Sequence, residues 1–318
     1  MCTAITYKTR DHYFGRNLDL EGGYGERVAI TPRHFSLAFR YASPLATHYA
    51  MIGMAAVAGG YPLYFEATNE KGLSVAGLNF PHNAVYGEYM AGKTNLAPFE
   101  LIPYLLGAYA TADEARAALA DICVVHCSFS EDLPVTPLHW MIADGEASIT
   151  LECTSNGMRV YDNPFGVLTN NPPFDFHLQN IKNYMALHEG AAENRLTPAV
   201  SPENYSLGMG ALGLPGDFSS ASRFVRAVFV KEKSVSDGSE AGSVNQFFHI
   251  LRSVAMPKGC VLTPSGEYEY TRYSSCCNTE TGVYYYTTYE NATPRRVAMR
   301  DFDLDGAALY ISEEKGTV

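Results

Sequence analysis

The start of the chain places three chemically useful side chains close together in sequence: Cys2, Arg16 and Asp19. Because a small residue at position 2 favours removal of the initiator methionine, we expect Cys2 to become the N-terminal residue, with a thiol and a free α-amine. An α-amine titrates at roughly 7.7–8.0 and can take the proton of the thiol. A neighbouring cation such as Arg16 favours the thiolate. Cys2 is thus a candidate nucleophile that supplies its own base; the alternative is a small apolar residue in a first strand.

These three residues meet only if the first two strands form a hairpin. Strand-like segments on either side of a turn at 8–11 place Cys2 opposite residues 16–18, which brings Arg16 within reach of the thiol. Successive side chains of a strand point to opposite faces, so Arg16 and Asp19 serve one site only if the strand bends or bulges just before Asp19. The alternative is a surface ion pair of Arg16 with Asp19 at a strand end.

Cleavage of an amide also requires donors for the negative charge that develops on the carbonyl oxygen. Two short segments contain suitable asparagines: Gly77–Phe80 with Asn79, and Leu168–Pro172 with Asn170. An amide NH₂ or a backbone N–H held rigidly at a strand end stabilises such an oxyanion by about a few kcal/mol. Considered alone, each asparagine is more often a turn or cap residue.

The composition indicates a globular protein with a large core. Of the 318 residues, 47% are hydrophobic and 18% are charged, and the net charge is −11 with the Lys and Arg residues dispersed. This distribution offers no basic stripe for a phosphate backbone, so we expect no nucleic-acid partner. No apolar run approaches the roughly 20 residues of a membrane span, and no signal peptide is recognisable. We therefore expect a cytoplasmic protein without a membrane span.

Seven cysteines in a long chain without a secretory signal indicate reduced thiols rather than a disulfide framework. Cys123 and Cys127, with His126 beside them, have the residue types of metal ligands, but no second cluster follows at zinc spacing, so we expect no metal. The motifs of serine hydrolases, P-loop proteins and zincins are also missing, and no cofactor is expected.

Strand-like and helical patterns follow one another in blocks. The expected strands are 2–7, 12–18, 49–57, 72–80, 138–143, 147–153, 158–161, 166–169, 268–276, 282–289 and 295–299. The expected helices are 101–109, 114–120, 175–187, 220–231 and 244–255. Blocks of this kind, without regular β-α alternation, predict an α+β fold built in layers.

One long segment, 189–216, is rich in Gly, Pro, Asn and Ser and has no regular pattern. Loops of this length in a folded domain are usually functional or contact another molecule. We expect either a subunit-contact arm or a disordered excursion.

Several segments, in order along the chain, resemble the choloylglycine hydrolase family. They are Met1-Cys2-Thr3, Phe14–Asp19, Asn69–Leu73, Gly77–Phe80, Leu168–Pro172, Gly213–Phe218 and Ser222-Arg223-Phe224. The match begins at residue 1 and extends over most of the chain, and its motifs are jointly specific. The resemblance implies one N-terminal-nucleophile hydrolase domain over 1–318, with a four-layer αββα fold of two antiparallel sheets between helical layers. It also implies a homotetramer, with 189–216 as the assembly loop.

The residues that match the catalytic positions of the family are Cys2, Arg16, Asp19, Asn79, Asn170 and Arg223. The resemblance implies that Cys2 is the nucleophile and its amine the base. Arg16 is implied to lie beside the thiol and Asp19 to hold the amine. The two asparagines are implied to contribute to the oxyanion hole, and Arg223 to complete the polar network.

Bile salt hydrolases and penicillin V acylases share this machinery within the family. An asparagine at position 79 is typical of the bile salt branch, whereas the penicillin V branch has a tyrosine there. The resemblance thus implies cleavage of glycine- or taurine-conjugated bile salts through an acyl-thioester. The alternatives are an acylase for penicillin V or another N-acyl amide such as an N-acyl-homoserine lactone, and a binding protein without catalysis. The residues that match the family's apolar substrate-contacting loops are Leu18, Leu63, Tyr64, Phe129 and Leu133.

Overall fold

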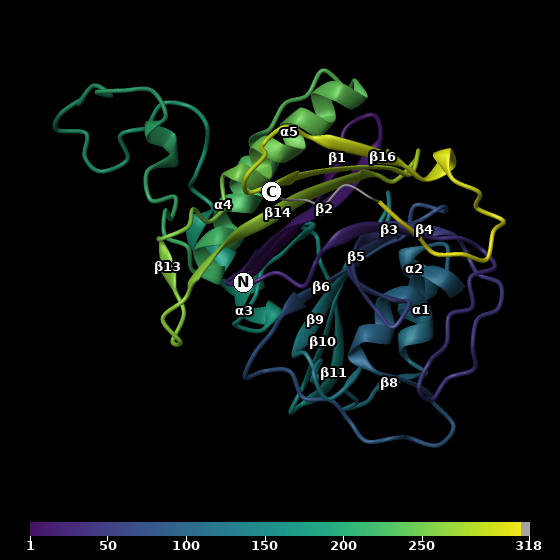
Figure 1. Ribbon diagram of the computed structural model, residues 1–318. Coiled ribbons are helices and arrows are strands. Elements are labelled where there is room, and N and C mark those ends of the chain that lie inside the picture. Colours follow the sequence, from purple (N-terminus) through teal and green to yellow (C-terminus); the bar gives the residue numbers. More distant parts are fainter. Residues whose placement is uncertain (313–318) are drawn as a thin grey trace.

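Two antiparallel β-sheets pack face to face, and helices cover the outer face of each (Figure 1). This computed structural model describes residues 1–312. Helices α4 (Ser220–Lys233) and α5 (Glu240–Arg252) contact the first sheet. Helices α1 (Leu101–Ala108) and α2 (Ala112–Leu119) contact the second. These four layers confirm the predicted α+β fold with the order αββα.

The first sheet has seven strands and contains the start of the chain. Its strands are β1 (Cys2–Lys8), β2 (His12–Leu20), β12 (Val167–Leu168), β13 (Val261–Leu262), β14 (Tyr268–Asn278), β15 (Val283–Thr288) and β16 (Arg295–Ala298). Their order across the sheet is β12-β1-β2-β14-β15-β16, with β13 paired to β14. The N-terminal hairpin therefore lies inside the sheet, between a strand from the middle of the chain and one from near its end.

The second sheet has eight strands in the order β11-β10-β9-β6-β5-β4-β3-β17. Their bounds are β3 (Arg27–Thr31), β4 (Met51–Ala58), β5 (Tyr61–Asn69), β6 (Ser74–Asn79), β9 (Leu138–Ala143), β10 (Ser148–Thr154), β11 (Gly157–Asp162) and β17 (Tyr310–Ile311). A separate parallel pair is formed by β7 (Thr94–Leu96) and β8 (Ile122–Val124). The remaining helical segments are α3 (Phe174–Asn180) and 3₁₀ turns at Pro98–Glu100, Ile181–Tyr184, Met209–Ala211 and Met299–Asp301.

Buried apolar side chains form two cores. One is shared by the inner faces of the two sheets and by α4 and α5, and it includes Cys2, Leu18 and Phe224. The other lies between the second sheet and α1 and α2, and it includes Trp140. Cys2 thus starts its strand inside the larger core, where neighbouring elements on both sides of the first sheet fix its surroundings.

Six strands, β3, β5, β7, β8, β13 and β17, were not predicted, and one helix is shorter than expected. The strand β5 was not predicted, because Pro62 near its start argues against a central strand. Pro62 is tolerated since it lies in the part of β5 that pairs only with β4; pairing with β6 begins at Glu66. The helix expected over 175–187 is shorter: α3 ends at Asn180, and a 3₁₀ turn follows.

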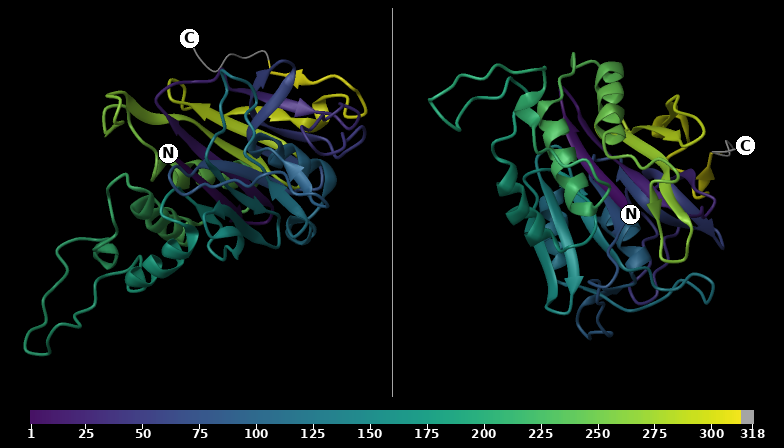
Figure 2. Two further views of the ribbon diagram at one scale, coloured as in Figure 1. Left: turned by 90° about the horizontal axis from the view of Figure 1, so that it is seen from below. Right: turned by 90° about the vertical axis from the view of Figure 1, so that its left-hand side faces the viewer.

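The segment 189–216 projects from the body of the molecule as a long arm (Figure 2). It contains little regular structure apart from the 3₁₀ turn at Met209–Ala211. Within residues 1–312, no helix combines the length and apolarity required to cross a bilayer.

Candidate active site

The hairpin of β1 and β2 has the predicted register, with Cys2 opposite Leu18 and Ala4 opposite Arg16. Directly opposed residues share one face of a sheet, so the side chains of Cys2, Leu18 and Arg16 lie on the same side. That side is the one turned toward the second sheet, because Arg16 reaches main-chain oxygens of β5 and β6. Cys2 is almost fully buried there, at 2% exposure.

Arg16 is a completely buried cation beside Cys2. Its Nη1 donates to the main-chain oxygen of Phe65 at 3.0 Å and to that of Gly77. Its Nη2 is buried and has no hydrogen-bond partner among residues 1–312. Burial lowers the pKa of Arg16, but the neighbouring Cys2 and the buried acidic groups raise it further, so the net shift is upward. The guanidinium is therefore a fixed positive charge with spare donors next to the thiol.

Asp19 lies on the other face of β2, as the pleat requires. Its Oδ1 accepts a hydrogen bond of 2.6 Å from the hydroxyl of Thr271, and its Oδ2 is buried without a partner in the described chain. The expected irregularity occurs at this point, but in the neighbouring strand: Thr271 pairs with Asp19 and Tyr273 with Leu18, which leaves Arg272 of β14 as the extra residue. The prediction of a bulge in β2 itself is corrected accordingly, because β2 keeps a continuous register with β1.

The amine of Met1 occupies the space between these groups. It donates to the main-chain oxygen of Asp19 at 2.8 Å and forms an ion pair with Glu269. Burial lowers the pKa of this amine, whereas the nearby Cys2 and Asp19 act in the opposite direction. The N-terminus thus lies where both faces of the hairpin can reach it, which is how Arg16 and Asp19 contribute to one site from opposite sides.

Asn170 links the backbone of Cys2 to the end of the second sheet. Its Oδ1 accepts hydrogen bonds from the Cys2 nitrogen at 2.8 Å and from Arg223 Nη2 at 2.7 Å. Its Nδ2 donates to the main-chain oxygen of Asn79 at 2.6 Å. The main chain of Asn170 is itself held, because its nitrogen donates to Ser220 Oγ at 2.8 Å. These bonds fix the position of the Asn170 side-chain amide and direct its Oδ1, rather than its Nδ2, toward the Cys2 nitrogen.

Arg223 reaches the same point from the first turn of α4. Ser219 caps this helix, and the guanidinium of Arg223 is fully buried. Its Nη1 donates to the carbonyl oxygen of Cys2 and, at 2.6 Å, to Thr3 Oγ1. Burial lowers the pKa of Arg223, and the nearby Asp19 and Cys2 oppose that shift. Two guanidinium groups therefore enclose Cys2, one from each side of the first sheet.

Asn79 ends β6 and is the least confined of the six predicted catalytic residues, being half-buried. Only its main-chain oxygen is occupied, by Asn170. Its side-chain amide makes no hydrogen bond among residues 1–312, which leaves its donors free for another molecule. The structure thus brings all six residues to one place at the N-terminal end of β1.

A buried pair behind the two asparagines was missed at the sequence level. His139 Nδ1 lies 3.0 Å from Glu152 Oε1, and His139 Nε2 lies 3.0 Å from the main-chain oxygen of Thr169. The imidazole also stacks on Phe80, with ring centroids 4.3 Å apart. The pair therefore supports the two segments that carry Asn79 and Asn170. In the sequence, the only sign of this pair is that a histidine and a glutamate occur inside otherwise apolar strands.

The five predicted substrate contacts do not form one group. Leu18 lies opposite Cys2 in the hairpin, and Leu63 of β5 is half-buried. Tyr64 belongs to the core between the second sheet and α1, where its hydroxyl bonds Thr31 Oγ1 at 2.7 Å. The structure therefore does not bring Tyr64 to the Cys2 site, and both Leu18 and Tyr64 lie in strands rather than loops.

Phe129 and Leu133 lie in a loop whose ends are joined, since the Phe129 nitrogen donates to the Leu133 oxygen at 3.2 Å. The ring of Phe129 packs at 6.0 Å from that of Tyr61 and at 5.2 Å from that of Phe99. This loop therefore packs against the start of β5. Two side chains that the sequence analysis did not single out continue the apolar surface around Leu18: Leu20 and Phe65 pack against the core that contains Cys2.

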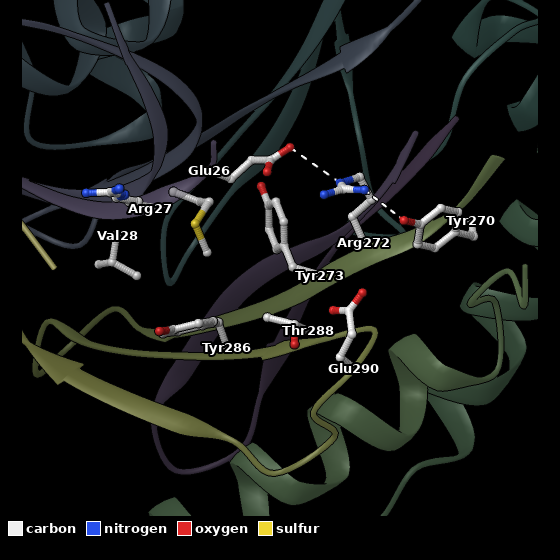
Figure 3. A pocket seen from close by; sticks show the side chains of 10 residues that line it. Glu26, Arg27, Val28, Tyr270, Arg272, Tyr273, Tyr286, Thr288 and Glu290 are labelled. Carbon is white, nitrogen blue, oxygen red and sulfur yellow. Dashed lines mark hydrogen bonds and ion pairs between the residues drawn. The ribbon is translucent and has the colours of Figure 1, made fainter. Parts of the chain in front are cut away.

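A small cavity lies next to the bulge in β14 (Figure 3). Its volume of about 30 Å³ accommodates about one water molecule, which is too little for a metabolite. Arg272 points into it between Glu26, whose Oε1 is 3.7 Å from Nε, and Tyr270, whose hydroxyl accepts from Nη1 at 2.8 Å. The cavity thus belongs to the polar support of the bulge. Among residues 1–312, no cluster of three or more His, Cys, Asp or Glu side chains has the geometry of a metal site.

Comparison with known proteins agrees with this geometry. The family model for linear amide C–N hydrolases, choloylglycine hydrolase family, matches residues 2–312. The bile salt hydrolase/transferase of Lactiplantibacillus plantarum is 51% identical over 309 residues, which cover 97% of this chain and 95% of that protein.

Solved structures share the fold. The C2A mutant of the conjugated bile acid hydrolase from Clostridium perfringens has a TM-score of 0.91 at 35% identity, covering 100% of this chain and 98% of that chain. Penicillin V acylase from Agrobacterium tumefaciens has a TM-score of 0.76 at 20% identity, covering 97% and 90%, and is similar in fold alone. The fold is therefore the predicted N-terminal-nucleophile hydrolase fold, and the chain belongs to the choloylglycine hydrolase family of linear amide C–N hydrolases.

Proposed function

We propose that this hydrolase cleaves the amide bond of glycine- or taurine-conjugated bile salts, with Cys2 as the nucleophile once Met1 has been removed. The observation that carries the proposal is the arrangement at Cys2, where Asn170 holds the nitrogen at 2.8 Å and two buried guanidinium groups enclose the residue. The 51% identity to a bile salt hydrolase/transferase supports bile salts as the substrate class.

Removal of Met1 completes the site. The Cys2 nitrogen becomes an α-amine that still donates to Asn170 Oδ1, as in the present geometry. The partnerless Oδ2 of Asp19 gives the new ammonium a buried anionic neighbour. The main-chain N–H and oxygen of Asp19 also lose their partners in Met1, which opens space for the substrate next to the amine.

The reaction then follows in two stages. The thiol of Cys2 gives its proton to the α-amine, and the sulfur attacks the amide carbon, forming a tetrahedral oxyanion. The free amide donors of Asn79 and the second Nδ2 hydrogen of Asn170 stabilise this charge. The amine passes its proton to the leaving nitrogen, glycine or taurine departs, and water hydrolyses the acyl-thioester. A competing amine that attacks the thioester instead of water gives acyl transfer.

The steroid part of the substrate is an apolar body that requires an apolar wall. Leu18, Leu20 and Phe65 form such a surface beside Cys2, and the ring of Tyr24 lies 6.2 Å from that of Phe65. Tyr24 is 59% exposed, so this surface continues to the outside of the molecule. Leu63, half-buried in β5, and Phe129 and Leu133, in the loop packed against the start of β5, are further candidate contacts outside this surface.

The arm at 189–216 supports assembly as the predicted homotetramer. Its large apolar side chains are exposed in the single chain, and another subunit can bury them. All seven cysteines are free thiols, which supports a reducing compartment such as the cytoplasm.

The test is a substrate panel with protein whose intact mass shows loss of Met1. Glycocholate, taurocholate and penicillin V are each incubated with the enzyme, and free glycine, taurine or phenoxyacetate is measured. We expect release from at least one bile salt at a rate about tenfold or more above that from penicillin V. Preferred cleavage of penicillin V would assign the enzyme to the acylase branch, and no cleavage of any amide would contradict the proposal.

A further inference from the structure

A second buried carboxylate, Glu66 of β5, lies behind the proposed nucleophile. It is 1% exposed and accepts hydrogen bonds from the hydroxyls of Tyr273 at 2.7 Å and Tyr284 at 2.5 Å. The two tyrosines belong to β14 and β15, so the cluster joins the two sheets through polar groups inside an apolar core. Burying a carboxylate in this way is costly unless its charge is compensated. The reaction described above makes no use of it.

Glu66 faces Arg16. The carboxylate Oε2 is 3.9 Å from Arg16 Nε, close enough for strong attraction but too long for a hydrogen bond. Arg16 is held independently of Glu66, because its Nη1 donates to the main-chain oxygens of Phe65 and Gly77. A change in the charge of Glu66 would therefore alter the field at Arg16 while leaving the guanidinium in place.

The charges around Cys2 come from few groups. Arg16, Arg223 and the terminal amine each interact with Cys2, and Asp19 acts on all three of these groups. The titratable groups facing Glu66 are Arg16 from β2, Tyr273 and Cys277 from β14, and Tyr284 from β15.

Two buried guanidinium groups therefore lie near the thiol, and three carboxylates lie near the thiol, the amine or Arg16: Asp19, Glu66 and Glu269, which is ion-paired with the terminal amine. Asp19 is the largest attractive charge on Arg223, whereas Glu66, 3.9 Å from Arg16 Nε, acts on Arg16 more strongly than Asp19 does. Burial raises the pKa of Glu66; Arg16 and the two tyrosine hydroxyls act in the opposite direction, but the net shift is upward.

We propose that Glu66, positioned by the hydroxyls of Tyr273 and Tyr284, is the counter-charge of Arg16 and thereby sets how readily the Cys2 sulfur ionises. It is a positioning residue that acts through Arg16, and the inference rests on the proposed role of Cys2 as the nucleophile. With part of its charge balanced by Glu66, Arg16 attracts the thiolate less strongly. The proton then stays on the sulfur until the α-amine takes it during attack, which keeps the thiolate sufficiently basic to be a strong nucleophile.

The experiment is a pH profile of Cys2 alkylation by iodoacetamide in protein that lacks Met1. Modification of the N-terminal peptide is followed by mass spectrometry for wild type, Glu66→Gln, Tyr273→Phe and Tyr284→Phe. In Glu66→Gln the acid limb of the profile should move to lower pH by about one unit, because a nearby negative charge is gone. The plateau rate should fall about threefold, because a sulfur that ionises more readily is a weaker nucleophile. Each Tyr→Phe variant should move the limb the same way, by less.

Two controls accompany this series. Glu70→Gln removes a carboxylate paired with Arg33 just beyond the end of β5, and it should leave the Cys2 profile unchanged. Exposed Cys260 is an internal reference whose alkylation should be the same in every variant.

The outcomes separate this inference from the proposed function. If iodoacetamide does not modify the wild-type N-terminal peptide, or modifies it without loss of turnover, the proposed role of Cys2 is contradicted. If it is alkylated but folded Glu66→Gln gives a superimposable profile, or only a uniform loss of rate, the inference about Glu66 is overturned. Thermal melting shows whether each variant is folded. If Glu66→Gln is unfolded, the pH profiles of Tyr273→Phe and Tyr284→Phe test the inference instead.

Discussion

The Cys2 site and the arm at 189–216 are built in opposite ways. At Cys2, hydrogen bonds join residues far apart in sequence, such as the Cys2 nitrogen and Asn170, which are separated by 168 positions. In the arm the bonds are local: Asn204 and Ala192 bond each other twice, at 2.9 and 3.0 Å. The site is enclosed by its own chain, whereas Leu196 and Leu207 of the arm are 94% and 100% exposed. The comparison teaches that contacts within one chain build the site, while the apolar side chains of the arm are left exposed in the single chain.

The largest effect should come from removing the sulfur. Cys2→Ser should lower turnover at least about a thousandfold, because a hydroxyl at this position is a far weaker nucleophile. The fold should persist, since serine has nearly the same size and the cores are unchanged. Bile salt turnover and the thermal unfolding midpoint measure the two halves of this prediction. A serine variant as active as wild type would exclude Cys2 as the nucleophile.

Asn170→Ala should have the next largest effect. It removes the acceptor of the Cys2 nitrogen and of Arg223 Nη2 and one donor to the oxyanion, so kcat should fall about a hundredfold. The two buried donors left without an acceptor should also lower the free energy of unfolding by about 2 kcal/mol. Urea denaturation and steady-state kinetics measure both.

The matched control is the neighbouring Asn171→Ala. Asn171 donates only to the main-chain oxygen of Pro81, at 2.6 Å, and does not touch Cys2. Its replacement should change kcat by less than about tenfold. Equal losses in the two variants would mean that Asn170 acts through general stability.

Lowering the pH should destabilise the body of the molecule before it affects the arm. Burial lowers the pKa of His12 and of His177 from the ordinary 6.5 to about 4. The unfolded chain therefore binds more protons between these values, so stability is fully present above pH 6.5 and is lost as the pH falls toward 4. Each histidine contributes at most about 3 kcal/mol of this loss.

Urea midpoints measured from pH 7.5 to pH 4 test this expectation. His12→Gln should flatten the dependence of the unfolding free energy on pH, whereas His34→Gln, at an exposed histidine, should leave it as in wild type. A His12 variant with the full wild-type slope would contradict the assignment.

The smallest effect on turnover should come from the arm. Replacing Leu196 and Leu207 together by serine should shift the proposed tetramer to smaller species in light scattering, because the exposed apolar area is lost. Turnover per subunit should stay within about twofold, since every described contact to Cys2 comes from outside the arm. Val235→Ser, at an 83% exposed residue of the body, should leave the assembly intact. An unchanged tetramer in the arm variant would show that the arm does not hold it together.

Much of this organisation could be predicted from the sequence, because it depends on local signals. The hairpin of β1 and β2, the paired strands β9 and β10 and the helix α2 each follow from patterns of adjacent residues. The family motifs then placed Cys2 and its partners in one site, and the structure brings those residues together.

The parts that could not be predicted depend on distant packing. The bulge that accompanies Asp19 lies in β14, a strand that begins about 250 residues further along the chain. The roles of Glu66 and of the His139–Glu152 pair require knowing which strands face each other. The position of Tyr64 could not be predicted either, because the face of a strand is known only once its neighbours are known, and Tyr64 lies in the core that packs on α1.

The most direct test of the account is to capture the acyl-enzyme. Protein without Met1 is mixed with glycocholate, stopped with acid within its first turnovers, and digested for mass spectrometry. We predict a bile acyl group in thioester linkage on the N-terminal peptide, located on Cys2, and its absence from protein that retains Met1. Turnover with the acyl group on another residue, or full activity with Met1 in place, would contradict the claim that the sulfur and amine of one terminal residue cleave the amide.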